Sequence, residues 1–243
     1  GYAYEIWNEE EAQFYEQPAD TYASFFKAAA IGISDGDQAA FKMPGGYGGT
    51  PENFFVRLLL RNGVTDYADA YAYHNHTSVL RGKSYSKFVE SVAKKHMNAA
   101  LAYDAFQPVW VTEAGINMAV DGNEIPADDT LSSQARYYVV GTVQQLAYGA
   151  KKSFWFRMGH FMEDGNEWGT YNKESQPYPA VNSIAMLTKI LKKGEFKGTL
   201  NTVGDVEGYL FDTGDSDAAV VWSDSEGRCQ LYTDLPVKVT SLD

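Results

Sequence analysis

The chain has 243 residues, of which 44% are hydrophobic and 14% aromatic, and its formal net charge at pH 7 is −12. This length and composition allow one large domain with a sizeable core and argue against long disordered stretches. Such a charge is repelled by nucleic acid and by anionic membranes unless a basic stripe overrides it, and the sequence shows no such stripe. We therefore expect no nucleic-acid partner and no membrane partner.

Cysteine content and hydropathy narrow the class of protein further. Cys229 is the single cysteine, which excludes an intramolecular disulfide and a cysteine-rich metal site. No apolar run approaches the ~18 residues that a transmembrane helix needs. The expected location is secreted or periplasmic, although no leader is visible in the sequence.

Up to residue 193 the sequence alternates between two kinds of segment. Short apolar or β-rich runs predict strands over Tyr2–Trp7, Ala39–Met43, Ala68–Tyr73, Pro108–Thr112 and Lys152–Phe156. Helical spacing predicts helices over Asp20–Ile33, Pro51–Asn62, Ser84–Tyr103, Leu131–Tyr148 and Tyr178–Leu191. Such alternation indicates βαβ units and a parallel sheet.

A parallel sheet of this kind is either an open doubly wound sheet or a barrel. A doubly wound dinucleotide fold would carry a glycine-rich phosphate-binding turn after its first strand. The candidate segment, Pro44-Gly45-Gly46-Tyr47-Gly48-Gly49, has neither the GxGxxG nor the GxxxxGK[ST] arrangement. We interpret it as a strand-to-helix loop.

The pattern changes after Gly194. Turn signals separate short β-rich runs, which predict strands over Glu207–Thr213, Ala218–Trp222, Arg228–Thr233 and Pro236–Leu242. The chain is therefore expected to divide into a parallel α/β part over residues 1–193 and an antiparallel β module over residues 194–243.

Two glutamates lie at the predicted ends of parallel strands. Glu9 ends the first predicted strand and Glu113 ends the fourth. The C-terminal ends of parallel strands meet at the edge where such folds build their sites. Two carboxyl groups held ~5–5.5 Å apart suit the hydrolysis of glycosides with retention, one as the acid and the other as the nucleophile.

The residues around these glutamates resemble a known family. Ile6-Trp7-Asn8-Glu9 is similar to the Asn-Glu motif at the end of strand 4 in clan A glycoside hydrolases, and Val111-Thr112-Glu113-Ala114-Gly115 resembles their strand 7 motif. The resemblance implies that Glu9 is the acid/base, that Glu113 is the nucleophile and that Asn8 contacts the sugar 2-hydroxyl.

Three further segments extend the resemblance. The segment 70–76 is similar to strand 6 of the clan, with His74 at the position of a histidine that contacts the nucleophile and His76 where tyrosine is more common. Ser153-Phe154-Trp155-Phe156 resembles strand 8, which implies that Trp155 lines the sugar subsite, and Met43-Pro44-Gly45-Gly46 resembles the end of strand 5. Trp168, in the long loop 159–176, is a further candidate for stacking on sugar.

The resemblance implies an α/β fold, namely a partial (β/α)8 TIM-type barrel with strands 4 to 8, followed by the small antiparallel module. Strands 1 to 3 of such a barrel do not appear in the sequence. We therefore expect either an oligomer or a missing N-terminal half that completes the barrel. Glu10 and Glu11 follow Glu9 where proline is common, and both rank below Glu9 as the acid because they leave the strand.

The predicted function is that of a retaining β-glycosidase acting on plant-type polysaccharide or oligosaccharide, with a carbohydrate substrate and no cofactor. No metal is expected, because His74 and His76 have no third ligand at short spacing and there is no HExxH motif. The alternatives are a non-catalytic carbohydrate-binding remnant and a purely structural half-barrel that associates through its exposed sheet edges.

Overall fold

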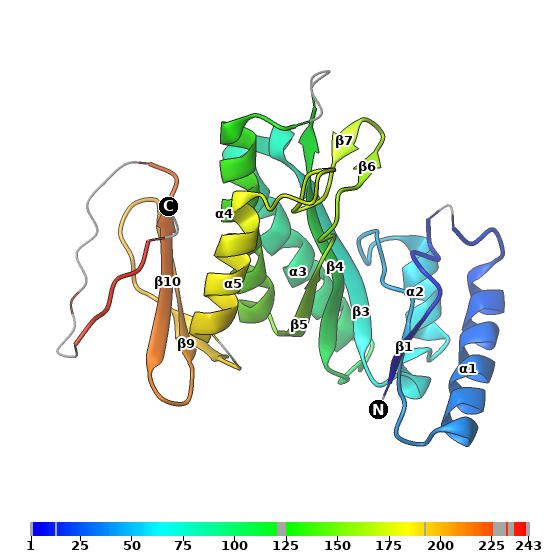
Figure 1. The fold of residues 1–243 in the computed structure, drawn as a ribbon. Helices are drawn as coiled ribbons and strands as arrows, with labels where there is room; N and C mark the ends of the chain where they lie inside the picture. The colour runs from blue at the N-terminus through cyan, green and yellow to red at the C-terminus, as the bar shows by residue number, and fades with distance from the viewer. Residues whose placement is uncertain are drawn as a thin grey trace.

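The structure is a computed structural model, and it describes residues 2–12, 14–120, 125–191, 193–225, 232 and 236–241. Figure 1 shows parallel strands at the centre, with helices packed beside them and a second β-sheet beyond α4 and α5. The fold class is α/β, as the sequence predicts.

Five strand–helix units follow one another along the chain. The strands are β1 (Ala3–Ile6), β2 (Phe41–Pro44), β3 (Tyr71–Ser78), β4 (Val109–Ala119) and β5 (Ala150–Trp155). The helices are α1 (Ala19–Gly36), α2 (Phe54–Arg61), α3 (Tyr85–Ala102), α4 (Asp128–Ala147) and α5 (Pro179–Leu191), with short 3-10 helices η1 (Thr65–Tyr67) and η2 (Val79–Ser84). Each strand and helix predicted in this part of the chain overlaps an observed one.

The five strands are parallel neighbours in chain order. β1 pairs with β2, and β4 lies between β3 and β5. A parallel bridge between Tyr47 and Tyr73 joins the end of β2 to β3, where the amide of His74 donates to the carbonyl of Tyr47. A doubly wound sheet reverses its strand order at a switch point, whereas this order continues without reversal, as in a barrel.

The outer face of these strands is covered by helices. Tyr22 and Phe26 of α1, Leu59 of α2, and Tyr71 and Tyr73 of β3 are fully buried in one apolar cluster. A strand that is covered on both faces needs apolar side chains at successive positions, which explains the continuous apolar run that predicts β3.

A smaller apolar layer lies on the inner face. Met43, Ala72 and Trp110 form its centre, and the rings of Phe41 and Trp110 stack with centroids 4.6 Å apart. Side chains two residues apart on a strand share a face, so His74 follows Ala72 on this inner side. The polar side chains of the site therefore lie on the same face of the strands as this apolar layer, further toward the C-terminal ends.

A short hairpin follows β5. It consists of β6 (Met162–Glu163) and β7 (Asn166–Glu167), and β7 pairs antiparallel with the end of β4 through Met118 and Glu167. The fully buried carboxylate of Glu167 accepts hydrogen bonds from the amides of Phe161 and Gly169. These contacts hold the long loop after β5 against the upper end of β4.

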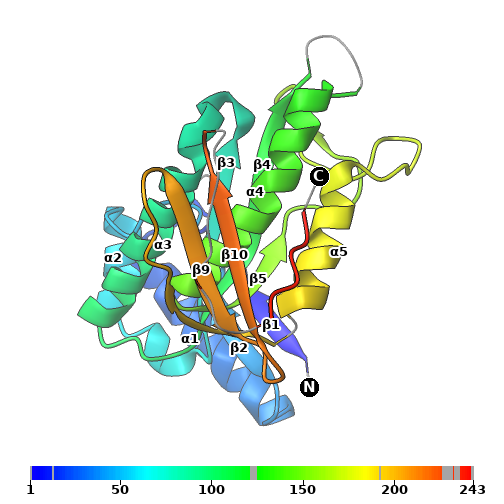
Figure 2. The same cartoon turned by 90° about the vertical axis from the view of Figure 1, so that its left-hand side faces the viewer.

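The C-terminal sheet is antiparallel and separate from the first. It contains β8 (Glu195–Thr199), β9 (Val206–Asp212) and β10 (Asp217–Ser223) in the order β10-β9-β8. Figure 2 shows β9 and β10 in front of α4. Phe211 of β9 is fully buried in one apolar cluster with Val143 of α4 and Leu187 of α5, so this sheet packs on the helices of the barrel part.

Of the four strands predicted within residues 194–243, some are observed and others are not. The strands predicted over Glu207–Thr213 and Ala218–Trp222 are β9 and β10. The one predicted over Arg228–Thr233 falls almost entirely outside the described residues. The strand predicted over Pro236–Leu242 is wrong for its described part, because residues 236–241 form no strand and all are exposed. A β-rich run without a pairing partner does not form a strand.

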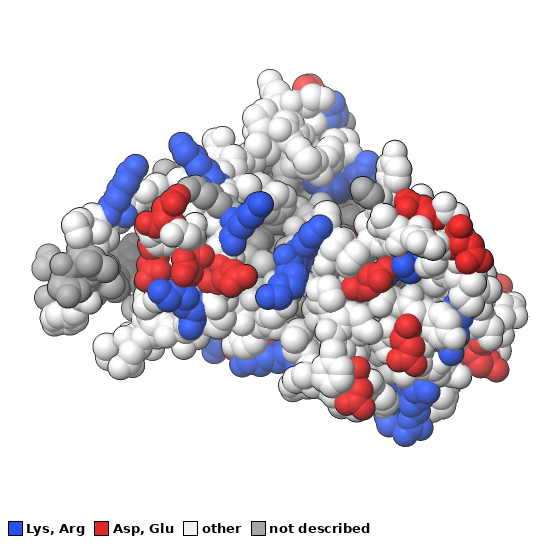
Figure 3. Space-filling view, turned by 90° about the horizontal axis from the view of Figure 1, so that it is seen from below, with Lys and Arg blue, Asp and Glu red and all other residues white. Residues whose placement is uncertain are grey.

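Within the described part of the chain, no helix is both long and apolar enough to cross a membrane. Seen from below, in Figure 3, the described residues show Lys and Arg side chains interspersed with Asp and Glu side chains.

Candidate active site

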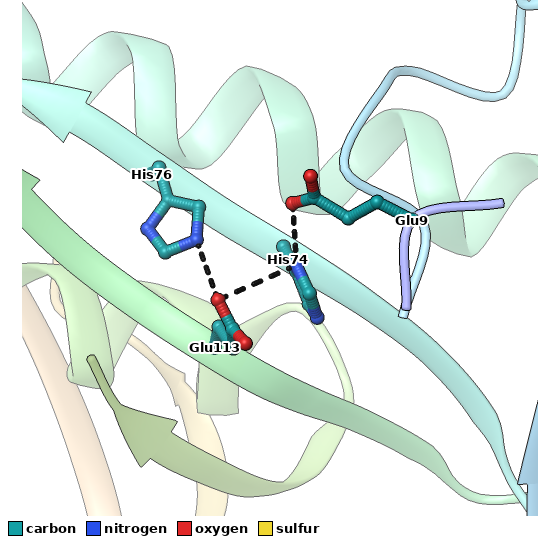
Figure 4. A group of neighbouring side chains, drawn as sticks. All are labelled: Glu9, His74, His76 and Glu113. Atoms are coloured by element: carbon teal, nitrogen blue, oxygen red, sulfur yellow. Dashed lines mark hydrogen bonds and ion pairs between the residues drawn. The ribbon is translucent and has the colours of Figure 1, made fainter. Parts of the chain in front are cut away.

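Four side chains from three segments converge at the C-terminal ends of the parallel strands. Glu9 lies in the loop after β1, His74 and His76 lie on β3, and Glu113 lies on β4 (Figure 4). The predicted strand ends are slightly wrong, since β1 ends at Ile6 and β4 continues to Ala119. The structure nevertheless brings both predicted glutamates and both predicted histidines together.

A β-bulge directs Glu113 into the site. Tyr73 pairs with Val111 while His74 pairs with Glu113, so Thr112 is an extra residue on β4. Thr112 donates its hydroxyl to Glu5 on β1 at 2.8 Å, which places it on the inner side with Glu113. Bulges of this kind are frequent beside active sites because they redirect one side chain against the normal alternation.

The four side chains form a continuous chain of contacts. The Nδ1 atom of His74 lies 2.7 Å from Oε1 of Glu9 and 3.6 Å from Oε2 of Glu113. The Nε2 atom of His76 lies 3.1 Å from the same oxygen of Glu113. One oxygen of Glu9 and one of Glu113 lie within 4.8 Å of each other. This separation is close to the ~5–5.5 Å between the carboxyl groups of retaining glycosidases.

The electrostatics favour an ionised Glu113. Partial burial raises the pKa of Glu113, but the hydrogen bond from His76 and the charges of His74 and His76 outweigh burial and hold the pKa below its ordinary value. Burial lowers the pKa of His74, but its hydrogen bond to Glu9 and the charges of Glu113, Glu9 and Glu5 together raise it. A carboxylate that remains ionised at neutral pH is suited to nucleophilic attack.

The glycine-rich loop after β2 packs directly on the site. A Cβ atom on Gly46 would lie 2.2 Å from Nε2 of His74, and one on Gly48 would lie 2.5 Å from the carboxyl carbon of Glu9. These glycines are needed because no larger residue leaves room for the site side chains. Their contact with a carboxylate also disfavours a phosphate at this position, in agreement with the interpretation of the segment as a loop.

Geometry distinguishes Glu9 from the two glutamates that follow it. Glu10 is fully buried beside Gly45, where a Cβ atom would lie 2.4 Å from its Oε2. Glu11 accepts a hydrogen bond from the amide of Gly49 at 2.5 Å. Of the three consecutive carboxylates, Glu9 is the one that meets His74. Its backbone has a φ of 42°, a left-handed conformation that is uncommon outside glycine and is found at functional sites.

Glu5 and Thr112 also lie at the site, although the sequence motifs do not point to them. The Oε1 atom of Glu5 accepts the Thr112 hydroxyl and lies 3.9 Å from Nε2 of His74. Burial raises the pKa of Glu5, although the Thr112 hydrogen bond and the charge of His74 act in the opposite direction. A charged residue inside a short parallel strand was the signal that could have identified Glu5.

The predicted role of Trp155 is not supported by its position. Its Nε1 donates to the Thr142 hydroxyl on α4 at 3.0 Å, so the side chain faces the helices and not the carboxylates. Alternation along β5 explains the error, because the neighbouring residue Phe156 is the one that faces the site. The rings of Phe156 and His76 lie edge to face with centroids 5.2 Å apart.

Trp168 reaches the site through the long loop after β5. Its ring lies 5.2 Å from that of His76 and 5.6 Å from that of Phe156, both edge to face. A Cβ atom on Gly115 would lie 3.2 Å from the Trp168 ring. The structure thus places Trp168 beside His76, the histidine that contacts Glu113.

Asn8 is exposed in the loop between β1 and α1. The backbone of this loop is held close to Gly45, since a Cβ atom there would lie 2.9 Å from the amide nitrogen of Asn8. Its predicted contact with the sugar 2-hydroxyl stays a prediction.

Comparison with solved structures identifies the fold. The chain is similar to a family 39 glycoside hydrolase from Bacteroides cellulosilyticus WH2, with a TM-score of 0.70 and 18% identity over 91% of this chain and 47% of the other. It is similar to a glucosidase from Croceicoccus marinus, with a TM-score of 0.57 and 12% identity over 84% and 46% of the two chains. It is also similar to a family 128 exo-β-1,3-glucanase from Aureobasidium namibiae, with a TM-score of 0.52 and 12% identity over 74% and 65%.

These similarities show that this chain has the fold of part of a (β/α)8 barrel, and they confirm the predicted fold class. The resemblance to clan A glycoside hydrolases is confirmed as a likeness in fold. The chain spans about half the length of the first two solved structures and less than two thirds of the third. No family model and no curated protein matches the sequence.

Proposed function

We propose that this site hydrolyses β-linked glycosides with retention of configuration, acting on plant-type polysaccharide or its oligosaccharides. The observation that carries the proposal is the close approach of two carboxylates at the ends of parallel strands, with oxygens of Glu9 and Glu113 within 4.8 Å of each other. The similarity in fold to a glucosidase and to an exo-β-1,3-glucanase supports the same class of substrate.

The proposed reaction has two displacement steps. Glu113 attacks the anomeric carbon while Glu9 donates a proton to the leaving oxygen, which yields a covalent glycosyl–enzyme intermediate. Glu9 then removes a proton from water, the water attacks the anomeric carbon, and the bond to Glu113 breaks. The lowered pKa of Glu113 supports its role as the nucleophile.

The remaining residues orient the reacting groups in this proposal. The hydrogen bond from His76 keeps Glu113 ionised and fixes its orientation. His74 bonds to Glu9 and lies near Glu113, so it links the two carboxylates. Trp168 offers its ring to the sugar and Asn8 contacts the 2-hydroxyl. Trp155 has no part in it, because its side chain faces α4.

Replacement of the nucleophile tests the proposal. The variant Glu113→Ala should lose at least about a thousandfold in kcat on an activated aryl β-glycoside, because the covalent step needs the carboxylate. Added azide should restore product of inverted configuration, since a small anion fits the space that the side chain leaves. Glu16→Ala, at an exposed glutamate, is the matched control. Unchanged hydrolysis in Glu113→Ala would refute the assignment.

A non-catalytic carbohydrate-binding role is the second candidate. The chain spans less than two thirds of the solved structures to which it is similar. Strands β1 and β5, each with one parallel neighbour among the described residues, are the edges at which further strands or a second subunit would close a barrel. Oligosaccharide binding without any release of reducing sugar, even at high protein concentration, would favour this second role.

A further inference from the structure

Glu9, His74, His76 and Glu113 together offer a complete set of ligands for a transition metal. Each side chain presents one nitrogen or oxygen atom, and these four atoms all lie within 4.8 Å of one another. Two imidazoles with carboxylate oxygens form a donor set that Zn²⁺ accepts, and imidazole favours zinc and its neighbours over Mg²⁺ and Ca²⁺. The sequence offers no third ligand near the two histidines, and the fold supplies two from distant segments.

The spacing of the four atoms suits a tetrahedral ion. Zinc binds nitrogen and oxygen ligands at about 2.0–2.2 Å, so tetrahedral ligand atoms lie roughly 3.3–3.6 Å from one another. The contacts of 2.7 Å between His74 and Glu9, 3.6 Å between His74 and Glu113, and 3.1 Å between His76 and Glu113 bracket this spacing. The other pairs among the four atoms lie within 4.8 Å of each other, so some of these side chains must move inward by up to about 1.2 Å to enclose an ion.

Charge and access also favour a cation. Among the ion pairs of the described residues, Glu9 and Glu113 pair with imidazoles and not with Lys or Arg. A divalent ion would therefore be the strongest positive charge at these two carboxylates. Glu9, His76 and Glu113 have side chains that are 20%, 24% and 28% exposed, so an ion can reach the cluster from solvent.

We propose that this cluster binds Zn²⁺ or a similar divalent transition-metal ion, and that the bound ion inhibits the site by occupying both carboxylates. Zinc is an inhibitory ligand here and not a cofactor, because its coordination engages the groups that would attack and protonate a glycoside. Binding of the ion rests only on the four donor atoms, whereas its inhibitory effect rests on the proposed hydrolysis.

Isothermal titration calorimetry of the full chain with Zn²⁺, and with Mg²⁺ for comparison, tests the proposal. Zn²⁺ should bind with one-to-one stoichiometry and at least about tenfold more tightly than Mg²⁺. The variants His76→Gln and Glu113→Gln should each weaken Zn²⁺ binding by at least about tenfold, because each removes one ligand. His160→Gln is the matched control, since His160 is partly exposed in the loop after β5 and lies outside the cluster.

Two results would overturn the proposal. One is the absence of saturable Zn²⁺ binding to the wild-type chain. The other is a Zn²⁺ affinity that does not depend on the cluster, because it falls as much in His160→Gln as in the two cluster variants or is unchanged in both cluster variants. Circular dichroism identifies a cluster variant that fails to fold, and the Zn²⁺ affinity of the other cluster variant then tests the proposal. Calorimetry requires no turnover, so failure of zinc binding leaves the hydrolysis proposal standing, and an inactive chain leaves the zinc result valid.

Discussion

Glu10 is a buried carboxyl group directly beside the candidate acid. It is fully buried, and the nearby Tyr22 hydroxyl donates its hydrogen to the carbonyl of Ile6. Burial raises the pKa of Glu10 well above its ordinary value. Burial therefore favours the neutral form of Glu10, while its neighbour Glu9 meets solvent and His74.

This burial predicts a pH-dependent cost to stability. Because the pKa of Glu10 is higher in the folded than in the unfolded chain, the folded state binds its proton more tightly. The free energy of unfolding should therefore decrease as pH rises from the unfolded pKa of about 4.3 through the folded pKa.

The variant Glu10→Gln should remove this dependence. Near neutral pH it should be more stable than the wild type, by on the order of 1–3 kcal/mol, and below about pH 4 the difference should shrink. Urea unfolding at a series of pH values measures the effect, with Glu16→Gln at an exposed position as the control. A stability difference that does not change with pH would refute a raised pKa of Glu10 in the folded chain.

Among the elements, the loop after β2 packs against the site, and its glycines leave room for the side chains of the site. Gly45, Gly46 and Gly48 each lie so close to the side chains of Glu10, His74 and Glu9, respectively, that a Cβ atom would approach to 2.5 Å or less. Glycine is therefore required here for space and not for a turn conformation.

The variant Gly46→Ala should consequently destabilise the chain by about 1–3 kcal/mol, because the added methyl group would overlap His74 and Thr112. Gly32→Ala is the matched control, since a Cβ atom there meets nothing within 4 Å inside α1 and should stabilise the helix by about 0.5–1 kcal/mol. Chemical denaturation compares the two variants, and a Gly46→Ala variant as stable as the wild type would contradict the packing of the loop on the site.

At the scale of the whole molecule, the C-terminal sheet shares a core with the helices of the barrel part. Phe211 of β9 lies in one cluster with Val143 and Leu187, and Arg136 of α4 bonds to the side chain of Asp224 beyond β10 at 2.6 Å. Such contacts couple the unfolding of the sheet to that of α4 and α5. The expected division of the chain into two domains, 1–193 and 194–243, remains a prediction.

Truncation of the buried ring tests this coupling. The variant Phe211→Ala should lower the free energy of unfolding by about 3–5 kcal/mol and keep a single cooperative transition, whereas Phe196→Ala, at a residue 36% exposed, should lower it less. Differential scanning calorimetry distinguishes the outcomes. Two separate transitions in the wild type would show instead that residues 194–243 unfold as an independent module.

The strand–helix alternation up to residue 193, and with it the parallel sheet, could be predicted from the amino-acid sequence, because periodicity and turn chemistry are local properties of the chain. Short motifs near the ends of the predicted strands also made Glu9, His74, His76 and Glu113 candidates, and the structure brings these four side chains together. Which side chains face the site depends on tertiary contacts and could not be predicted in this way. A bulge at Thr112 directs the side chain of Glu113 into the site. Alternation along β5 directs Trp155 toward α4, so that Phe156 faces the site instead. Glu10 is buried, whereas Glu9 is partly exposed. These outcomes depend on pairing between distant strands, which no local pattern contains.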